Sequence, residues 1–223
     1  MGHLPGLIAF DLDGTLVDSR RDLADSANDL IREMGGAPLA EEAVGGMVGG
    51  GAALLVRRAL DAVGLESSPA AVARFLEIYD TRLLNHTRLY DGMLDVVRSL
   101  HGHARLTVLT NKPLRPSERI LDGLGLRDLF HDVVGGDGPH ARKPDPSGLQ
   151  GMMASAGTSG DRTLLVGDSA IDYETARRAS ARCCLMSNGI GQRTLTPEML
   201  ASSDWVAGDS TALAAAVEQF LVD

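Results

Sequence analysis

The chain has 223 residues and a net charge of −9, and its composition is 44% hydrophobic and 23% charged. These values are ordinary for a folded globular protein and argue against disorder in most of the chain. No basic block or stripe is present, which argues against nucleic acid or an anionic membrane surface as the main partner. No apolar run is long enough to span a bilayer and no signal-peptide pattern begins the sequence, so we expect a cytoplasmic protein.

The first predicted strand, Leu7 to Phe10, is followed by a segment in which the apolar residues recur at helical spacing. We expect three or four helices between about residues 17 and 90, the first of them with Ser19 or Asp18 as its N-cap. A glycine-rich stretch, Gly45 to Gly51, is expected to form a flexible loop between two of these helices. The segment therefore interrupts the pattern that the rest of the chain follows.

After the helical segment, short apolar runs alternate with helical patterns. The later runs are Leu106 to Leu109, Leu164 to Val166 and Cys183 to Met186, and the helical patterns are Asp95 to Leu100, Pro116 to Leu124 and Tyr173 to Ala179. Trp205 and the tail to Asp223 are expected to add a last strand and a closing helix. Continuous apolar runs are typical of parallel strands buried on both faces, so the alternation predicts an α/β fold with a doubly wound, Rossmann-like parallel sheet. We expect a core domain made of residues 1–16 and 91–223, and an inserted α-helical cap made of residues 17–90.

The end of the first strand carries two carboxylates, in Asp11-Leu-Asp13-Gly14-Thr15. The carboxyl ends of strands in an open parallel sheet face the ligand crevice, and Gly14 provides the freedom for a tight turn there. A pair of buried carboxylates repels itself unless it shares a cation or a proton. Because Mg²⁺ binds carboxylate oxygens together with water, we expect it as the cofactor.

Three further segments carry candidate site residues. Asp168 follows a buried strand and Asp172 lies four positions later, so a helix starting there would bring another carboxylate to the same metal site. Thr110 and Asn111 end a second strand and offer a hydroxyl and an amide to a phosphate, and Lys143 stands before a proline-rich helix start. Each feature alone is typical of a turn, a helix cap or a solvated surface. Their combination at three strand ends and one helix start favours phosphoryl transfer.

The segments around Asp11, Thr110, Lys143 and Asp168 together resemble the four motifs of the haloacid dehalogenase superfamily. The resemblance covers about residues 7–186 and places the helical insertion where that family has its type 1 cap. Within the superfamily the chain is most similar to phosphoglycolate phosphatases. The passages that carry this closer likeness are Gly49-Gly-Gly-Ala-Ala-Leu-Leu55, Leu109-Thr-Asn-Lys-Pro113 and Val134-Gly-Gly-Asp137.

The resemblance implies a role for each carboxylate of the first motif. Asp11 would attack phosphorus and carry the phosphoryl group as an aspartyl-phosphate, which divides one difficult displacement into two. Asp13 would protonate the leaving alkoxide and then act as the base for the hydrolytic water. Asp11 and the backbone carbonyl of Asp13 would also contact the metal.

The other motifs would supply the phosphate and metal sites. Thr110 and the backbone amide of Asn111 would hold the phosphoryl oxygens, and Lys143 would neutralise charge on the nucleophile and the transferring group. Asp168 would bind Mg²⁺ directly, and Asp172 would support the site from behind or through water. The resemblance thus implies a small-molecule phosphate ester as substrate, with phosphoglycolate as the leading prediction.

The sequence differs from the patterns typical of two other reactions on this fold. Dehalogenases of the superfamily lack the second aspartate of the first motif, which is present here as Asp13. Phosphonoacetaldehyde hydrolases use a cap lysine, whereas this cap has none. A β-phosphoglucomutase-like mutase and a non-catalytic phosphometabolite-binding protein stay open as alternatives, although the latter would be expected to have lost Asp11, Asp13 or Lys143.

The cap is expected to set the choice of substrate. Its arginines can bind a carboxylate or a second phosphate, although helix arginines usually face solvent. The candidates among them are Arg57, Arg58, Arg74, Arg82 and Arg88. The adjacent Cys183 and Cys184 are expected to be reduced and buried rather than bridged.

Overall fold

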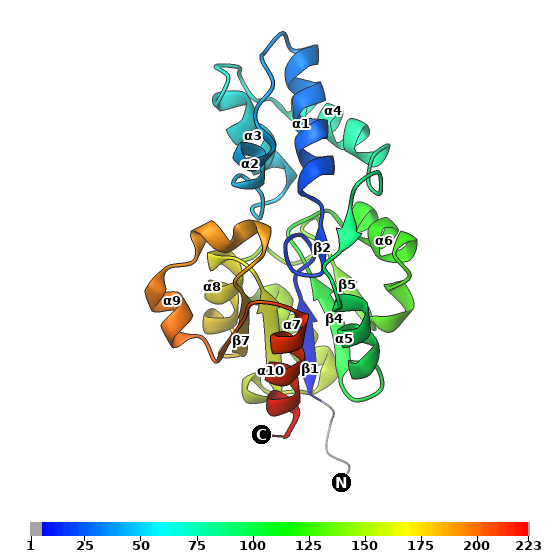
Figure 1. The fold of residues 1–223 in the computed structure, drawn as a ribbon, viewed down its shortest axis with the longest axis vertical. Helices are drawn as coiled ribbons and strands as arrows, with labels where there is room; N and C mark the ends of the chain where they lie inside the picture. Colours follow the sequence, from blue (N-terminus) through cyan, green and yellow to red (C-terminus); the bar gives the residue numbers. More distant parts are fainter. Residues whose placement is uncertain (1–5, 223) are drawn as a thin grey trace.

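Six parallel strands form one sheet at the centre of the larger part of the molecule (Figure 1). The computed structural model describes residues 6–222 and orders the strands β5-β4-β1-β6-β7-β8. The strands are β1 (Leu7–Phe10), β4 (Arg105–Leu109), β5 (Asp132–Val134), β6 (Thr163–Gly167), β7 (Arg182–Met186) and β8 (Trp205–Ala207). The chain adds β4 and β5 on one side of β1 and then returns to add β6, β7 and β8 on the other. This reversal confirms the predicted doubly wound sheet and creates a crevice at the carboxyl ends of the central strands.

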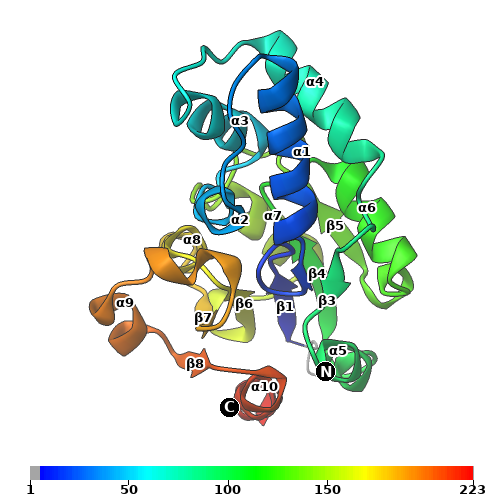
Figure 2. The same cartoon turned by 45° about the horizontal axis from the view of Figure 1, so that its top comes forward.

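Helices cover both faces of this sheet (Figure 2). Ile8 and Phe10 of β1 belong to the apolar cluster that also includes side chains of α5 (Met93–Leu100) and α10 (Ser210–Val222). Leu7 and Ala9 belong to a second cluster, with side chains of α7 (Ser147–Ala156) and α8 (Ala170–Arg178). Because alternate residues of a strand face opposite sides, a strand buried in this way must be apolar throughout.

The same alternation separates the two cysteines of β7. Cys183 belongs to the cluster with α7 and α8, and Cys184 to the cluster with α5 and α10. Both are buried and free, as the sequence predicts. Their side chains therefore lie on opposite faces of the sheet, where they cannot bridge.

Four helices lie together beyond the carboxyl ends of the strands and form the upper part of Figure 1. They are α1 (Arg20–Glu33), α2 (Glu41–Gly45), α3 (Ala52–Asp61) and α4 (Pro69–Asp80). The chain enters this helical group through β2 (Val17–Asp18) and leaves it through β3 (Arg88–Leu89). These two strands pair antiparallel, with Asp18 opposite Arg88, in a ribbon that the sequence analysis did not predict. The helices fall within residues 17–90, whose division from the core as a cap domain stays a prediction.

The remaining elements connect the strands of the core. They are α6 (Leu114–Gly123), α9 (Pro197–Ser202) and three short 3-10 turns at Arg127–Leu129, Gly160–Arg162 and Ile190–Thr194. None of the described helices is long and apolar enough to cross a membrane. The start of the chain, on which the expectation of no signal peptide rests, lies largely outside the described residues.

Candidate active site

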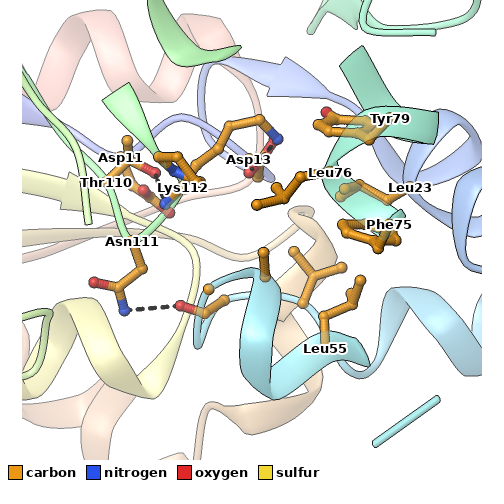
Figure 3. Close-up of a pocket in the computed structure, with 15 residues that line it drawn as sticks. Asp11, Asp13, Leu23, Leu55, Phe75, Leu76, Tyr79, Thr110, Asn111 and Lys112 are labelled. Carbon is orange, nitrogen blue, oxygen red and sulfur yellow. Dashed lines mark hydrogen bonds and ion pairs between the residues drawn. The ribbon is translucent and has the colours of Figure 1, made fainter. Parts of the chain in front are cut away.

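The carboxyl ends of β1, β4 and β6 bring the predicted site residues to one crevice beneath the helical group. Figure 3 shows those that follow β1 and β4. Asp11 directly follows β1, Thr110 directly follows β4, and Asp168 directly follows β6. All three side chains are buried. Gly14 closes the turn after β1 with a φ of +93°, and a Cβ atom there would collide with the carboxylate of Asp168. A glycine is therefore required at this position both by backbone conformation and by the approach of the two strand ends.

Lys143 links two of the buried carboxylates. Its Nζ lies 2.9 Å from Oδ1 of Asp11 and 2.6 Å from Oδ1 of Asp172, and its side chain is only 3% exposed. The other oxygen of Asp172 accepts two hydrogen bonds from Ser169 at the start of α8, from Oγ at 2.6 Å and from the backbone N–H at 3.2 Å. Asp172 is thus held by the helix start on one side and by the ammonium group on the other.

Asp11, Asp168 and Asp172 form a cluster in which one oxygen of each lies within 4.8 Å of the others. Burial raises the pKa of Asp11 to about 6, against the lowering effect of Lys143. Burial, together with Asp172 and Asp11, raises the pKa of Asp168 well above its usual range. Because one ammonium faces three buried carboxylates, the cluster keeps an excess of negative charge and hard oxygen donors. This donor set fits a divalent cation such as Mg²⁺.

Asp13 points away from this cluster and toward the helical group. It accepts a 2.5 Å hydrogen bond from Ser19 Oγ, and Nζ of Lys112 lies 2.9 Å from each of its carboxylate oxygens. Burial by itself would lower the pKa of Lys112, but the adjacent Asp13 and Tyr79 raise it above its usual range, so the ammonium is charged. Ser19, predicted as a helix N-cap, occupies that position without a side-chain capping bond and contacts Asp13 instead.

Lys112 is a site residue that the sequence analysis did not single out. It is one of only two lysines in the chain and directly follows Thr110-Asn111, which is the signal that could have identified it. The lysine is buried, and its Nζ lies 4.5 Å from the centroid of the Tyr79 ring. Lys112 contacts Asp13 after β1 and Tyr79 of α4, and so connects the core to the helical group. No local sequence pattern predicts this contact with α4.

The two residues after β4 have different environments. The Thr110 hydroxyl accepts a 3.2 Å hydrogen bond from the backbone N–H of Lys112 and faces the crevice. The Asn111 side chain donates from Nδ2 to the carbonyls of Gly49 and Lys143, each at 2.9 Å. Asn111 therefore joins the glycine-rich loop of the helical group to the loop that carries Lys143.

A small cavity, with a free volume of about 40 Å³, lies between Asp13 and the helices α1, α3 and α4. Much of its wall is apolar. The apolar side chains that line it are Leu23, Val48, Ala52, Leu55, Phe75, Leu76 and Pro113. The cap arginines considered in the sequence analysis do not line this cavity: Arg74, for example, is half exposed and pairs with Glu33 and Glu77.

Comparison with known proteins agrees with this arrangement. A family model described as haloacid dehalogenase-like hydrolase matches residues 8–186. A phosphoglycolate phosphatase of Rhodospirillum rubrum is 40% identical over 220 residues, with 91% of each chain covered. Phosphoglycolate phosphatase 1 of Pseudomonas aeruginosa is 39% identical over 195 residues, which cover 84% of this chain and 71% of that one. The crystal structure of a predicted phosphoglycolate phosphatase from Haemophilus somnus superposes with a TM-score of 0.89 at 28% identity, covering 97% of this chain and 100% of that one. The chain therefore belongs to the haloacid dehalogenase-like hydrolases, and within them to the phosphatases.

Proposed function

We propose that this phosphatase hydrolyses phosphoglycolate, in a Mg²⁺-dependent reaction that passes through an aspartyl-phosphate on Asp11. The observation that carries the proposal is the pairing of two carboxylates with two buried ammonium groups at the end of one strand. Asp11 lies beside Lys143, and Asp13 lies beside Lys112. The substrate is proposed from the names of the relatives at 37–40% identity.

In the first half of the reaction, an oxygen of Asp11 attacks phosphorus and the bond from phosphorus to the ester oxygen breaks. Asp13, which must take up a proton before this step, gives it to that oxygen, so glycolate leaves with a neutral hydroxyl group. Lys143 offsets the negative charge of the nucleophile and of the phosphoryl oxygens while the bond is transferred. The Thr110 hydroxyl and the Asn111 backbone amide hold the phosphoryl oxygens from the β4 side.

In the second half, water attacks phosphorus and the bond between phosphorus and the Asp11 oxygen breaks. Asp13, now a carboxylate, takes a proton from this water, and inorganic phosphate is released. Ser19 and Lys112 hold the Asp13 side chain in place for both proton transfers, because they bind it from two directions. The same residue therefore serves as acid and then as base.

Asp11, the backbone carbonyl of Asp13, and Asp168 would hold the Mg²⁺, with Asp172 orienting the site through Lys143 and Ser169. When bound, the ion neutralises charge on the phosphoryl group and on the carboxylate cluster. We expect the helical group to act as a lid that excludes water while Asp11 is phosphorylated, moving about the segments 16–18 and 90–92. The cytoplasmic location stays a prediction from the sequence.

The test is phosphate release from phosphoglycolate and from an aryl phosphate, with Mg²⁺ and with a chelator. The wild type is expected to release phosphate only with the metal, and Asp11→Asn is expected to release none while retaining its fold. Asp122→Asn, which makes the same change on the exposed surface of α6, is the matched control and should be fully active. Mass spectrometry of acid-quenched enzyme should find the phosphoryl group on the peptide that contains Asp11.

Two outcomes would contradict the proposal. Phosphate release that survives Asp11→Asn would remove the aspartyl-phosphate. Transfer of the phosphoryl group to another hydroxyl of a sugar phosphate, in place of release, would identify a mutase.

A further inference from the structure

The cavity between Asp13 and the helical group contains an ammonium group with spare hydrogen-bonding capacity. Lys112 has three N–H donors, and its Nζ lies 2.9 Å from each of the two Asp13 oxygens. Two donors suffice for these contacts, and the third can be shared between the nearby Tyr79 hydroxyl and a ligand. Lys112 is 6% exposed, and its charged group can therefore be reached only from within the cavity that it lines.

Tyr79 of α4 supplies a second donor to the same cavity. Its hydroxyl is buried near the ammonium group of Lys112 and has no partner in good hydrogen-bonding geometry among the described residues. Burial raises the pKa of Tyr79 to about 12 although Lys112 lowers it, so the hydroxyl keeps its proton. Figure 3 shows the hydroxyl pointing toward Lys112 and Asp13, from a ring that stacks on Phe75. A buried hydroxyl without a partner is costly, and a ligand oxygen placed here would remove that cost.

Lys112 is also the only cationic residue among the described residues that line this cavity. Within residues 6–222, Lys112 is paired with Asp13 alone, whereas Lys143 is paired with both Asp11 and Asp172 and does not line the cavity. The surrounding wall is apolar, which weakens the competition from water for any charge placed inside. The cavity thus offers an ammonium N–H and a neutral hydroxyl side by side, and a carboxylate can accept hydrogen bonds from both.

We infer that Lys112 and Tyr79 form the subsite that binds the carboxylate of the substrate. This inference rests on the proposed function, since it uses Asp13 as the residue that meets the leaving oxygen. In phosphoglycolate the carboxylate is attached to the carbon that bears the leaving oxygen. When the leaving oxygen of the substrate lies at Asp13, its carboxylate therefore lies near Lys112, which contacts Asp13. The small cavity suits a two- or three-carbon acid better than a sugar.

The test compares two substrates that differ only in the group at issue, 2-phosphoglycolate and ethyl phosphate. The measured quantity is the ratio of their kcat/KM values in wild type, Lys112→Met and Tyr79→Phe. Loss of a hydrogen bond to a charged group corresponds to roughly a 10- to 100-fold change. We expect the ratio to fall by about that factor in Lys112→Met and by about 10-fold in Tyr79→Phe. Arg57→Met, which removes an exposed cap cation outside the cavity, is the control and should leave the ratio unchanged.

A residue that only positioned Asp13 would give a different result, because both substrates depend equally on Asp13. An equal loss of kcat/KM for both substrates, with the ratio unchanged, would overturn the subsite while leaving the phosphatase proposal intact. A wild type that hydrolyses ethyl phosphate as well as phosphoglycolate would do the same. If Lys112→Met does not fold, Tyr79→Phe decides, since it keeps the ring and its packing on Phe75. Failure of the wild type on both substrates would overturn the proposed function itself, and the subsite with it.

Discussion

Replacing Lys143 by Met should reveal how strongly the metal-free site depends on a single cation. The ammonium group contacts Asp11 and Asp172 at 2.9 and 2.6 Å, and Asp168 belongs to the same buried cluster. Methionine has a similar length and can fill the space, so the change removes charge with little change in packing. What remains is a set of buried carboxylates without a counter-charge.

Removal of one partner from a buried ion pair costs about 3–5 kcal/mol of unfolding free energy. For a chain of this size that corresponds to a fall in melting temperature of roughly 6–20 °C. The measurement is urea and thermal unfolding of Lys143→Met and wild type at pH 7.5 in chelator. Added Mg²⁺ should recover part of the loss, because the ion takes over the neutralisation of the carboxylates.

The double variant Lys143→Met/Asp11→Asn separates charge from packing. If unpaired charge causes the loss, removal of one carboxylate should make the double variant more stable than Lys143→Met by about 1–3 kcal/mol. A single variant within about 1 kcal/mol of wild type in chelator would refute the reasoning, as would a double variant less stable than the single one.

Three further predictions concern the same crevice. Gly14→Ala should lower the melting temperature by clearly more than Gly102→Ala. Both glycines have a positive φ, but only a Cβ atom at position 14 would collide with Asp168. Equal falls in melting temperature would contradict this. Asn111→Asp should speed amide exchange in residues 45–51 by roughly 10-fold or more, since a carboxylate cannot donate to the Gly49 carbonyl; unchanged exchange would show that this contact is dispensable. Because the pKa of Asp11 is raised, the folded protein binds a proton there as the pH falls from about 6 to 4. The charged Asp11 carboxylate therefore lowers the unfolding free energy most above pH 6, and this loss is relieved as the pH falls. In chelator, Asp11→Asn should therefore exceed wild type in unfolding free energy at pH 7.5 by more than at pH 5, and a constant difference would argue against it.

Much of the core could be predicted because its signals are local. The apolar runs that end at Phe10, Leu109 and Val166 are strands, and the residues after them meet at one edge because parallel strands share a direction. β5 was not predicted, since Asp132–Val134 is three half-buried residues at the sheet edge with too little apolarity to form a pattern. The β2–β3 ribbon was missed for the same reason, because two-residue strands have no periodicity.

The cap side of the site could not be predicted, because it depends on contacts between distant segments. Tyr79 fits a helical apolar stripe, and the stripe alone does not reveal that its hydroxyl reaches a cavity shared with Lys112. The arginines of the cap were natural candidates for binding an anion, yet none of those considered lines the cavity. Arg57, Arg58 and Arg74 are exposed on α3 and α4, and Arg82 pairs with Asp29. A lysine that follows a strand usually lies in solvent. Lys112 is buried because α4 packs against it through Tyr79.

The β2–β3 ribbon makes the helical group, in topological terms, an enlarged hairpin loop. Asp18 and Arg88 are directly paired, so the chain leaves and re-enters the core at a single point. Any segment whose ends fit an antiparallel pair can be carried there without changing the order or register of the parallel sheet. We therefore expect that residues 19–87 can be exchanged for a two-residue Asn-Gly turn, which closes antiparallel pairs in hairpins. One scaffold for phosphoryl transfer can thus carry lids of different size, and substrate choice can change while Asp11, Lys143 and Asp168 keep their places.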